Sequence, residues 1–189
     1  MSLPTEPQLW SRDGFIISTD RALLSIPAIN HAFSQDFMYW VNALPEEVLQ
    51  KIIDGSFCFG LYKVLDGGPD PDLTSHGDNG IAQPSAEREA AKREQIGFAR
   101  LITDTVSFAY LTDLYVLPEY QGLGLGGWLI DCVDGVLDPL PYLRWVMLRT
   151  SVEKSKGSYE KRLGMSVLES RDIREGPVMM GKKGRAGRA

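Results

Sequence analysis

The chain has 189 residues, of which 43% are apolar and 24% are charged, and its formal net charge is −5. This length and balance predict one globular domain with a substantial core. No stretch is long and apolar enough to span a membrane, and residues 1–15 lack the basic start and apolar run of a signal peptide. We therefore expect a soluble protein of the cytoplasm, with the nucleus also open.

Charge is distributed unevenly along the chain. The last nine residues, 181–189, read GKKGRAGRA and hold four of the basic side chains. Without them the formal net charge is −9, four units more negative than that of the whole chain. A body this acidic is a poor binder of nucleic acid and a plausible attractor of cationic amines. We expect residues 181–189 to form a disordered basic tail.

Cysteine and histidine usage does not indicate a metal site. Cys58 and Cys132 lie in apolar surroundings, which favours core packing over a disulfide framework or zinc binding. His31 and His76 are far apart and have no partner at ligand spacing. The sequence therefore predicts no bound metal.

The first half of the chain predicts a strand, two helices and a second strand. GFIIST at 14–19 has the β-branched and aromatic residues of a strand. Ser25 is an N-cap for one amphipathic helix, and a second helix begins at Pro45, followed by two acids. SFCFGLYKVL at 56–65 is the next strand, and the Gly-, Pro- and charge-rich residues 66–94 read as a disordered surface insertion.

The second half predicts three more strands and two more helices, in a mixed order. Residues 95–103 and 106–117 suit an antiparallel strand pair turning at Asp104, and a helix begins near Gly124. An interior strand at 143–151, a short helix at 155–164 and a last strand at 165–173 follow. The predicted order is β-α-α-β-β-β-α-β-α-β, an α/β fold with a mixed sheet and one domain over residues 1–180.

The segment PEYQGLGLGGW at 118–128 places four glycines within six positions, between a strand and an apolar helix. A helix N-terminus exposes unpaired N–H groups and the positive end of the helix dipole, and glycines let phosphate oxygens approach the backbone. The segment therefore suits a pyrophosphate. The alternative is a tight strand-to-helix turn whose glycines serve close packing.

A dinucleotide or a P-loop nucleotide suits the segment less well. Gly122, Gly124 and Gly127 match G-x-G-x-x-G, but residues 118–121 separate them from the strand, and only 62 residues follow Gly127. A dinucleotide fold needs a tight turn directly off the strand and several further parallel strands. No Gly-Lys-Ser/Thr follows, so a P-loop is excluded.

The run DLYVLPEYQGLGLGGWLI at 113–130 resembles the acetyl-coenzyme A signature of the GNAT superfamily of N-acetyltransferases, Gln/Arg-x-x-Gly-x-Gly/Ala. Gln121, Gly124 and Gly126 occupy its three defined places. CFGLY, QIGFARLITD, FAYLTDLYVLPEY, RWVMLRTS and YEKRLGM are similar to further segments of one GNAT branch, in order, over about residues 14–168 outside the insertion.

This resemblance implies a GNAT fold with a bulged strand that splays from its neighbour and opens a cleft for the pantetheine arm of acetyl-CoA. Backbone groups of that strand would pair with the arm, and amides of the glycine segment would bind the pyrophosphate. The implied cofactor-binding residues are Leu114, Tyr115, Val116, Gln121, Gly122, Leu123, Gly124, Leu125, Gly126 and Gly127.

The resemblance also indicates catalytic residues. Asp113 is the candidate base for the attacking amine, directly or through water, although it could instead hold a loop or helix by hydrogen bonding. Tyr159 matches the tyrosine that GNAT members commonly use as general acid for the thiolate. Four residues separate it from Gly164 where the family has three, so it faces elsewhere unless a bulge absorbs the extra residue. A backbone N–H at the bulge, near Val116 or Tyr115, is the expected oxyanion donor.

The sequence thus predicts an enzyme that moves acetyl from acetyl-CoA to a primary amine by direct attack in a ternary complex. No cysteine lies in a recognised nucleophile position, which disfavours an acetyl-enzyme. The acceptor, a small molecule or a peptide, and a homodimer are left open. Tyr39 and Trp40 are candidates for the acceptor pocket, with packing inside the protein as the equal alternative. A catalytically degenerate acyl-CoA-binding module and, more distantly, a dinucleotide-binding protein are the alternatives.

Overall fold

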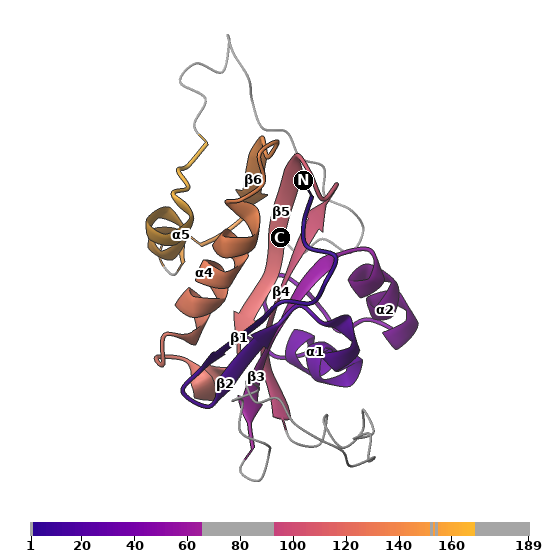
Figure 1. The fold of residues 1–189 in the computed structure, drawn as a ribbon. Helices are drawn as coiled ribbons and strands as arrows, with labels where there is room; N and C mark the ends of the chain where they lie inside the picture. The colour runs from indigo at the N-terminus through magenta and orange to yellow at the C-terminus, as the bar shows by residue number, and fades with distance from the viewer. Residues whose placement is uncertain (1, 66–92, 152, 154, 169–189) are drawn as a thin grey trace, which may run out of the picture.

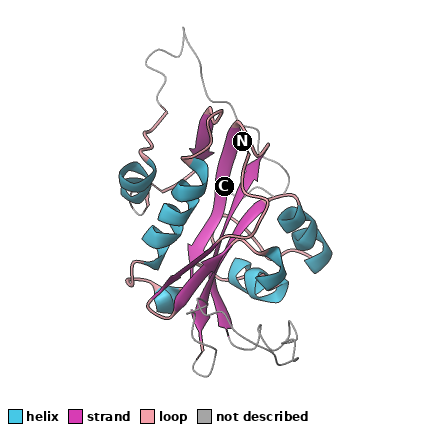
Figure 2. Cartoon of the chain, viewed as in Figure 1, coloured by secondary structure: helices cyan, strands magenta, loops and turns pink. Residues whose placement is uncertain are grey.

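A computed structural model of the chain describes residues 2–65, 93–151, 153 and 155–168. In this part of the chain a six-stranded sheet lies between two pairs of helices, α1 and α2 on one face and α4 and α5 on the other (Figures 1 and 2). The strands are β1 (Leu9–Arg12), β2 (Phe15–Ser18), β3 (Phe57–Val64), β4 (Arg93–Thr103), β5 (Phe108–Val116) and β6 (Trp145–Leu148). The helices are α1 (Ile26–Phe33), α2 (Glu46–Asp54), α4 (Leu125–Leu137) and α5 (Lys156–Leu163). The predicted α/β class with a mixed sheet is confirmed.

The strands follow chain order across the sheet, β1-β2-β3-β4-β5-β6. The first five pair antiparallel, and β5 pairs with β6 in parallel. That parallel pairing runs only from Phe108↔Trp145 to Leu111↔Leu148, although β5 continues to Val116. The pairing therefore ends halfway along β5, where β6 itself ends, and the rest of β5 has no strand partner on that side among the described residues.

The N-terminal strand prediction was incomplete, because residues 9–18 form a hairpin of two strands. Asp13 and Gly14 connect β1 to β2 with φ values of 50° and 80°. Two successive residues with positive φ form the tight turn whose twist suits a hairpin, and Asp-Gly is a preferred pair there. The mostly exposed strand β1 lacks the apolar run on which the prediction relied.

The predictions at the other boundaries have mixed outcomes. β4 begins at Arg93, two residues inside the predicted insertion, whose other residues lie outside the described part of the chain. β6 was predicted as an interior strand, but within the described residues it pairs only with β5 and forms an edge. Residues 165–168 are not in a strand, and the rest of the predicted last strand, together with the tail, lies outside the described residues.

The helix starts are confirmed, and each has a local cause. Ser25 is the N-cap of α1, where its Oγ accepts a hydrogen bond from the N–H of Ala28 at 3.3 Å. Pro45 precedes α2, whose first turn carries Glu46 and Glu47 at the positive end of the helix dipole. No helix in the described ranges has both the length and the apolar character needed to cross a bilayer.

Each face of the sheet has its own apolar core. Between the sheet and α4 the core contains Phe59, Leu61, Leu101, Leu129 and Val133, all inaccessible to solvent. On the other face, residues of α1 and α2 pack with side chains that include Cys58, Phe98 and Tyr115. Strands β3 to β5 are thus buried on both sides, so the segment that leads to the glycines is held rigidly.

The turn between β4 and β5 is built around Asp104, as predicted. Its Oδ1 accepts hydrogen bonds from the backbone N–H groups of Val106, Ser107 and Phe108 at 3.1, 2.8 and 3.0 Å. The pKa of this exposed carboxyl lies well below its usual range. The largest cause is the hydrogen bond from the hydroxyl of Ser107, followed by those from the backbone N–H groups of Ser107, Val106 and Phe108. This turn sets the register of β5.

Candidate active site

The glycine segment forms a loop that only glycine accommodates easily. β5 ends at Val116, and Pro118 starts a short 3₁₀ turn, Pro118–Tyr120. Gly122 and Gly124 then have φ values of 83° and 75°, and Gly124 is the N-cap of α4. A Cβ added to Gly122 would have no atom within 4 Å. Backbone conformation, and not crowding within the protein, therefore requires glycine at this position.

The backbone amides of this loop are available to a ligand. The first helical hydrogen bond of α4 runs from the N–H of Trp128 to the carbonyl of Gly124, at 3.0 Å. The six backbone N–H groups from Gly122 to Gly127 have no hydrogen-bond acceptor, either a carbonyl or a side chain, among the described residues. Six consecutive unpaired donors at the positive end of a 13-residue helix suit an anion.

Gln121 donates hydrogen bonds to other residues of the protein. Its side-chain Nε2 donates to the carbonyl of Val116 at 3.0 Å, and its backbone N–H donates to the carbonyl of Pro118 at 3.2 Å. These two bonds tie the start of the loop to the end of β5. The structure therefore places Gln121 at the site as a support for the loop.

Two arginines that the sequence analysis did not single out lie beside the loop. The guanidinium of Arg12 stacks over the ring of Trp128, 4.6 Å from its centroid, and its Nη2 is 4.0 Å from where a Cβ on Gly124 would be. The guanidinium of Arg162 lies 2.5 Å from the corresponding position at Gly127. Both add positive charge next to the free amides.

Arg12 was missed because strand β1 was missed. Arg162 lies on α5, three residues after Tyr159, and its Nη1 pairs with the carboxylate of Asp131 on α4. Residues three apart lie on one side of a helix, so Tyr159 and Arg162 both point from α5 toward α4. Helical spacing alone places Arg162 on the same side of α5 as Tyr159, but its contact with Gly127 depends on how α5 packs against α4.

β5 offers an open edge next to the loop. Beyond Leu111 its backbone on the β6 side has no strand partner among the described residues. On the other side, Leu117 donates to the carbonyl of Ile96 at 2.8 Å, and Gly97 faces Val116. Because antiparallel pairs alternate, the N–H of Val116 points away from β4 and toward the open edge, whereas that of Tyr115 points toward β4. Of the predicted backbone contacts, Val116 is the best placed.

The expected bulge lies within β5, at Asp113. Thr112 faces Arg100 and Tyr115 faces Phe98, so two residues of β5 lie opposite one residue of β4. Asp113 has a φ of 52°, the left-handed region that few residues other than glycine adopt. The bulge begins two residues after the pairing with β6 ends.

The carboxylate of Asp113 is buried and already paired. Its exposed fraction is 7%, and its Oδ2 accepts from Nε of Arg100 at 2.5 Å. Its Oδ1 accepts from the hydroxyl of Thr112 at 3.2 Å. The predicted base thus lies at the bulge, as expected, but both of its oxygens accept hydrogen bonds from protein groups.

Tyr159 points into the protein. Its ring packs against the core beneath α4, and burial raises the pKa of its hydroxyl above the usual 10.0. At the end of α5 the N–H of Gly164 donates to the carbonyl of Tyr159, five residues earlier, so the last turn is wider than an ordinary α-helical turn. Gly164 allows this widened turn because its φ is 61°.

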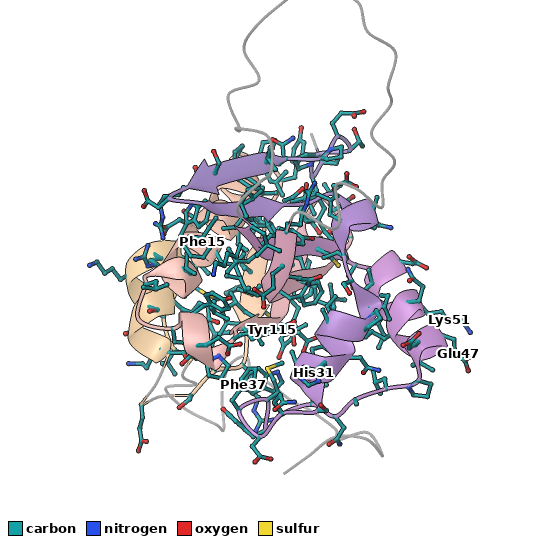
Figure 3. All side chains as sticks on the ribbon, turned by 90° about the horizontal axis from the view of Figure 1, so that it is seen from below. Phe15, His31, Phe37, Glu47, Lys51 and Tyr115 are labelled. Carbon is teal, nitrogen blue, oxygen red and sulfur yellow. The ribbon has the colours of Figure 1, made fainter. Side chains whose placement is uncertain are left out.

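The acceptor-side candidates, Tyr39 and Trp40, are partly exposed and stack edge to face, with ring centroids 4.9 Å apart. Phe37 anchors their loop: the centroid of its ring lies 6.1 Å from that of Tyr115 on β5 (Figure 3). The structure therefore brings the loop between α1 and α2 next to the bulged strand. Phe37 was not singled out from the sequence.

The two cysteines are buried in separate cores. Burial raises the pKa of Cys58 and of Cys132 from 9.0 to about 12. Since the thiolate is the reactive form, neither thiol is a good nucleophile near neutral pH.

Comparisons with known proteins point to one family. The family description "Acetyltransferase (GNAT) domain" matches residues 85–162, which include β5, the glycine loop and Tyr159. A protein of Gibberella zeae named "Putative acetyltransferase FG08082" is 40% identical over 177 residues, which cover 94% of this chain and 90% of that protein.

Solved structures agree with this assignment. A GNAT-family protein from Xanthomonas campestris pv. campestris has a TM-score of 0.58 at 31% identity, covering 86% of this chain and 96% of that one. A GNAT-family protein from Streptococcus pneumoniae, at 18% identity, shares the fold with a TM-score of 0.51, covering 94% of this chain and 100% of that one.

Proposed function

The chain belongs to the GNAT acetyltransferase family, and from that premise we propose that it transfers acetyl from acetyl-CoA to a primary amine. The observation that carries this proposal is the row of free amides from Gly122 to Gly127 next to the open edge of β5. A diphosphate fits such a row, and an extended arm fits such an edge.

The residues present fit acetyl-CoA in charge as well as in shape. Gly122 and Gly124 leave room for diphosphate oxygens, and Arg12 adds positive charge beside Gly124. The guanidinium of Arg162, paired with Asp131, lies against Gly127. The N–H of Val116 faces the edge along which an amide-containing arm would lie. Bound acetyl-CoA would supply an acetyl group activated as a thioester.

The chain itself would stabilise charge and donate a proton. A backbone N–H at the open edge, that of Val116, is our candidate donor to the developing oxyanion. Tyr159 is our candidate general acid, because its raised pKa keeps the hydroxyl protonated at neutral pH and no described residue accepts its proton. Since Asp113 is already bonded through both oxygens, we assign removal of the amine proton to water at the open edge.

Direct attack by the amine suits this site better than a two-step route. An acetyl-enzyme formed on cysteine would need a reactive thiol, and both thiols are buried with a raised pKa. We therefore propose a ternary complex of enzyme, acetyl-CoA and amine.

The acceptor is proposed only as a class, a primary amine of a small molecule or a peptide. The negative formal charge of the chain favours the approach of cationic amines. The exposed ring pair Tyr39 and Trp40 could contact such a cation through its π faces.

The proposal is tested by incubating the purified protein with acetyl-CoA and a panel of amines, namely a polyamine, an amino sugar, a peptide with a free N-terminus and free lysine. We expect release of free thiol that depends on both the protein and one of these amines. A reaction without amine is the control for hydrolysis. Absence of both turnover and acetyl-CoA binding would contradict the proposal.

The alternatives give different outcomes in a parallel melting experiment. A degenerate binding module would be stabilised by acetyl-CoA without releasing thiol, since a ligand that binds only the folded state raises the melting temperature. A dinucleotide-binding protein would be stabilised by NADH and not by coenzyme A.

A further inference from the structure

The ion pair at the bulge belongs to a chain of hydrogen bonds that crosses three elements. Arg100 on β4 uses its Nε for Asp113 on β5 and its Nη1 for the hydroxyl of Ser56, at 3.2 Å. Ser56 donates in turn to the carbonyl of Ile52, on α2, at 2.7 Å. The chain thus connects the end of α2 through β4 to the bulged residue.

This arrangement leaves Asp113 little capacity to take a proton from a substrate. Arg100 and Asp113 are 14% and 7% exposed, so the ion pair is largely shielded from water. A proton accepted by the carboxylate would break a buried ion pair and leave the arginine charge without its partner.

The same arrangement explains how Asp113 keeps an unusual backbone conformation. A positive φ is unfavourable for a residue with a side chain, and it persists where the surroundings enforce it. The carboxylate is held on one side by Arg100 and on the other by Thr112. The bulge fixed in this way bends β5 where its pairing with β6 ends.

We propose that the Arg100–Asp113 pair, anchored at Ser56, is a positioning device that fixes the bulge of β5 and so holds open the edge along which the acyl carrier binds. This inference rests on the proposed function and assigns Asp113 a role other than that of base. Asp113 acts through the backbone of Leu114 to Val116, and its charge serves to keep Arg100 in place.

Three variants separate the two roles. Asp113→Asn keeps a residue that tolerates positive φ and an oxygen that can accept from Arg100, but it removes the basic group. Asp113→Ala removes both the partner of Arg100 and the tolerance of positive φ. The double variant Arg100→Met/Asp113→Gly removes both charges and lets glycine adopt the bulge conformation, so it leaves no buried charge unpaired.

The first readout is the dissociation constant for acetyl-CoA from calorimetry, which requires no knowledge of the acceptor. We expect Asp113→Asn to bind within about threefold of the unsubstituted protein and Asp113→Ala to bind about tenfold more weakly, because small displacements of binding groups are costly. The double variant should recover most of the loss. The matched control is Thr105→Ala, which should bind acetyl-CoA normally. Thr105 is the other described non-glycine residue of the β4–β5 region with a positive φ, 69°.

The second readout is the pH dependence of kcat/KM with an amine that the panel identifies. Asp113→Asn should keep the acidic limb of the profile unchanged. A loss of about 100-fold or more in kcat for all three variants, with acetyl-CoA affinity unchanged, would identify Asp113 as a base and overturn the inference. Normal binding by Asp113→Ala would also overturn it. Failure of the unsubstituted protein to bind acetyl-CoA would instead defeat the proposed function, before any variant is compared.

Discussion

Gly122 and Gly124 hold conformations that an alanine enters at a cost of about 1–2 kcal/mol each. Neither replacement would create a clash below 4 Å, so the strain is in the backbone itself. We expect Gly122→Ala and Gly124→Ala each to weaken acetyl-CoA binding by about tenfold, since about 1.4 kcal/mol corresponds to that factor. Titration calorimetry measures the change.

Gly135 provides the matched control for these substitutions. It lies inside α4, has no atom within 4 Å of an added Cβ and does not have a positive φ. Gly135→Ala should therefore stabilise the fold by about 0.5–1 kcal/mol and leave acetyl-CoA affinity unchanged. Equal binding by all three alanine variants would mean that the loop conformation does not matter for the ligand.

At the level of elements, α5 packs the ring of Tyr159 against the core, and its last turn is widened at Gly164. Because no described residue shares a hydrogen bond with this hydroxyl, Tyr159→Phe should change the melting temperature little. If Tyr159 is the general acid, kcat should fall by about 100-fold or more while the dissociation constant for acetyl-CoA stays the same. An unchanged kcat would remove Tyr159 from the mechanism and direct attention to water as the proton donor.

The elements that could be predicted from the sequence are those set by local patterns. Helix starts follow such patterns: Ser25 caps α1 through its hydroxyl, and Pro45 and Gly124 hold the N-cap positions of α2 and α4. The glycine loop can be recognised because four glycines stand together. The contact of Arg100 with Asp113 depends on strand register across a bulge, and that of Arg162 with Gly127 depends on how two helices pack. Such long-range geometry has no signature in one sequence, and neither does the widened turn of α5.

The whole molecule should lose stability at alkaline pH because it buries several weak acids. Burial raises the pKa of Tyr62, Tyr115 and Tyr159 above 10.0, and that of the two thiols from 9.0 to about 12. Above pH about 9 the native state therefore holds more protons than the unfolded state, so the free energy of unfolding falls as pH rises. Urea unfolding between pH about 7.5 and about 10.5 measures this fall.

Replacing a buried and an exposed tyrosine separates the effect of burial on alkaline stability from a general effect of negative charge. The hydroxyl of Tyr62 is buried without a hydrogen-bond partner among the described residues, whereas Tyr142 is 66% exposed. Tyr62→Phe should reduce the alkaline loss of stability, and Tyr142→Phe should not. A stability that stays constant to pH about 10.5 in the unsubstituted protein would contradict this account.

The most direct test follows the backbone amides of Gly122 to Gly127 by NMR during a titration with acetyl-CoA. The account predicts that these six resonances, together with that of Val116, show the largest changes in chemical shift and reach saturation, and that NADH does not reproduce them. Saturable binding of acetyl-CoA that leaves all six unchanged, with the largest changes elsewhere in the chain, would contradict the assignment of the glycine loop as the diphosphate site.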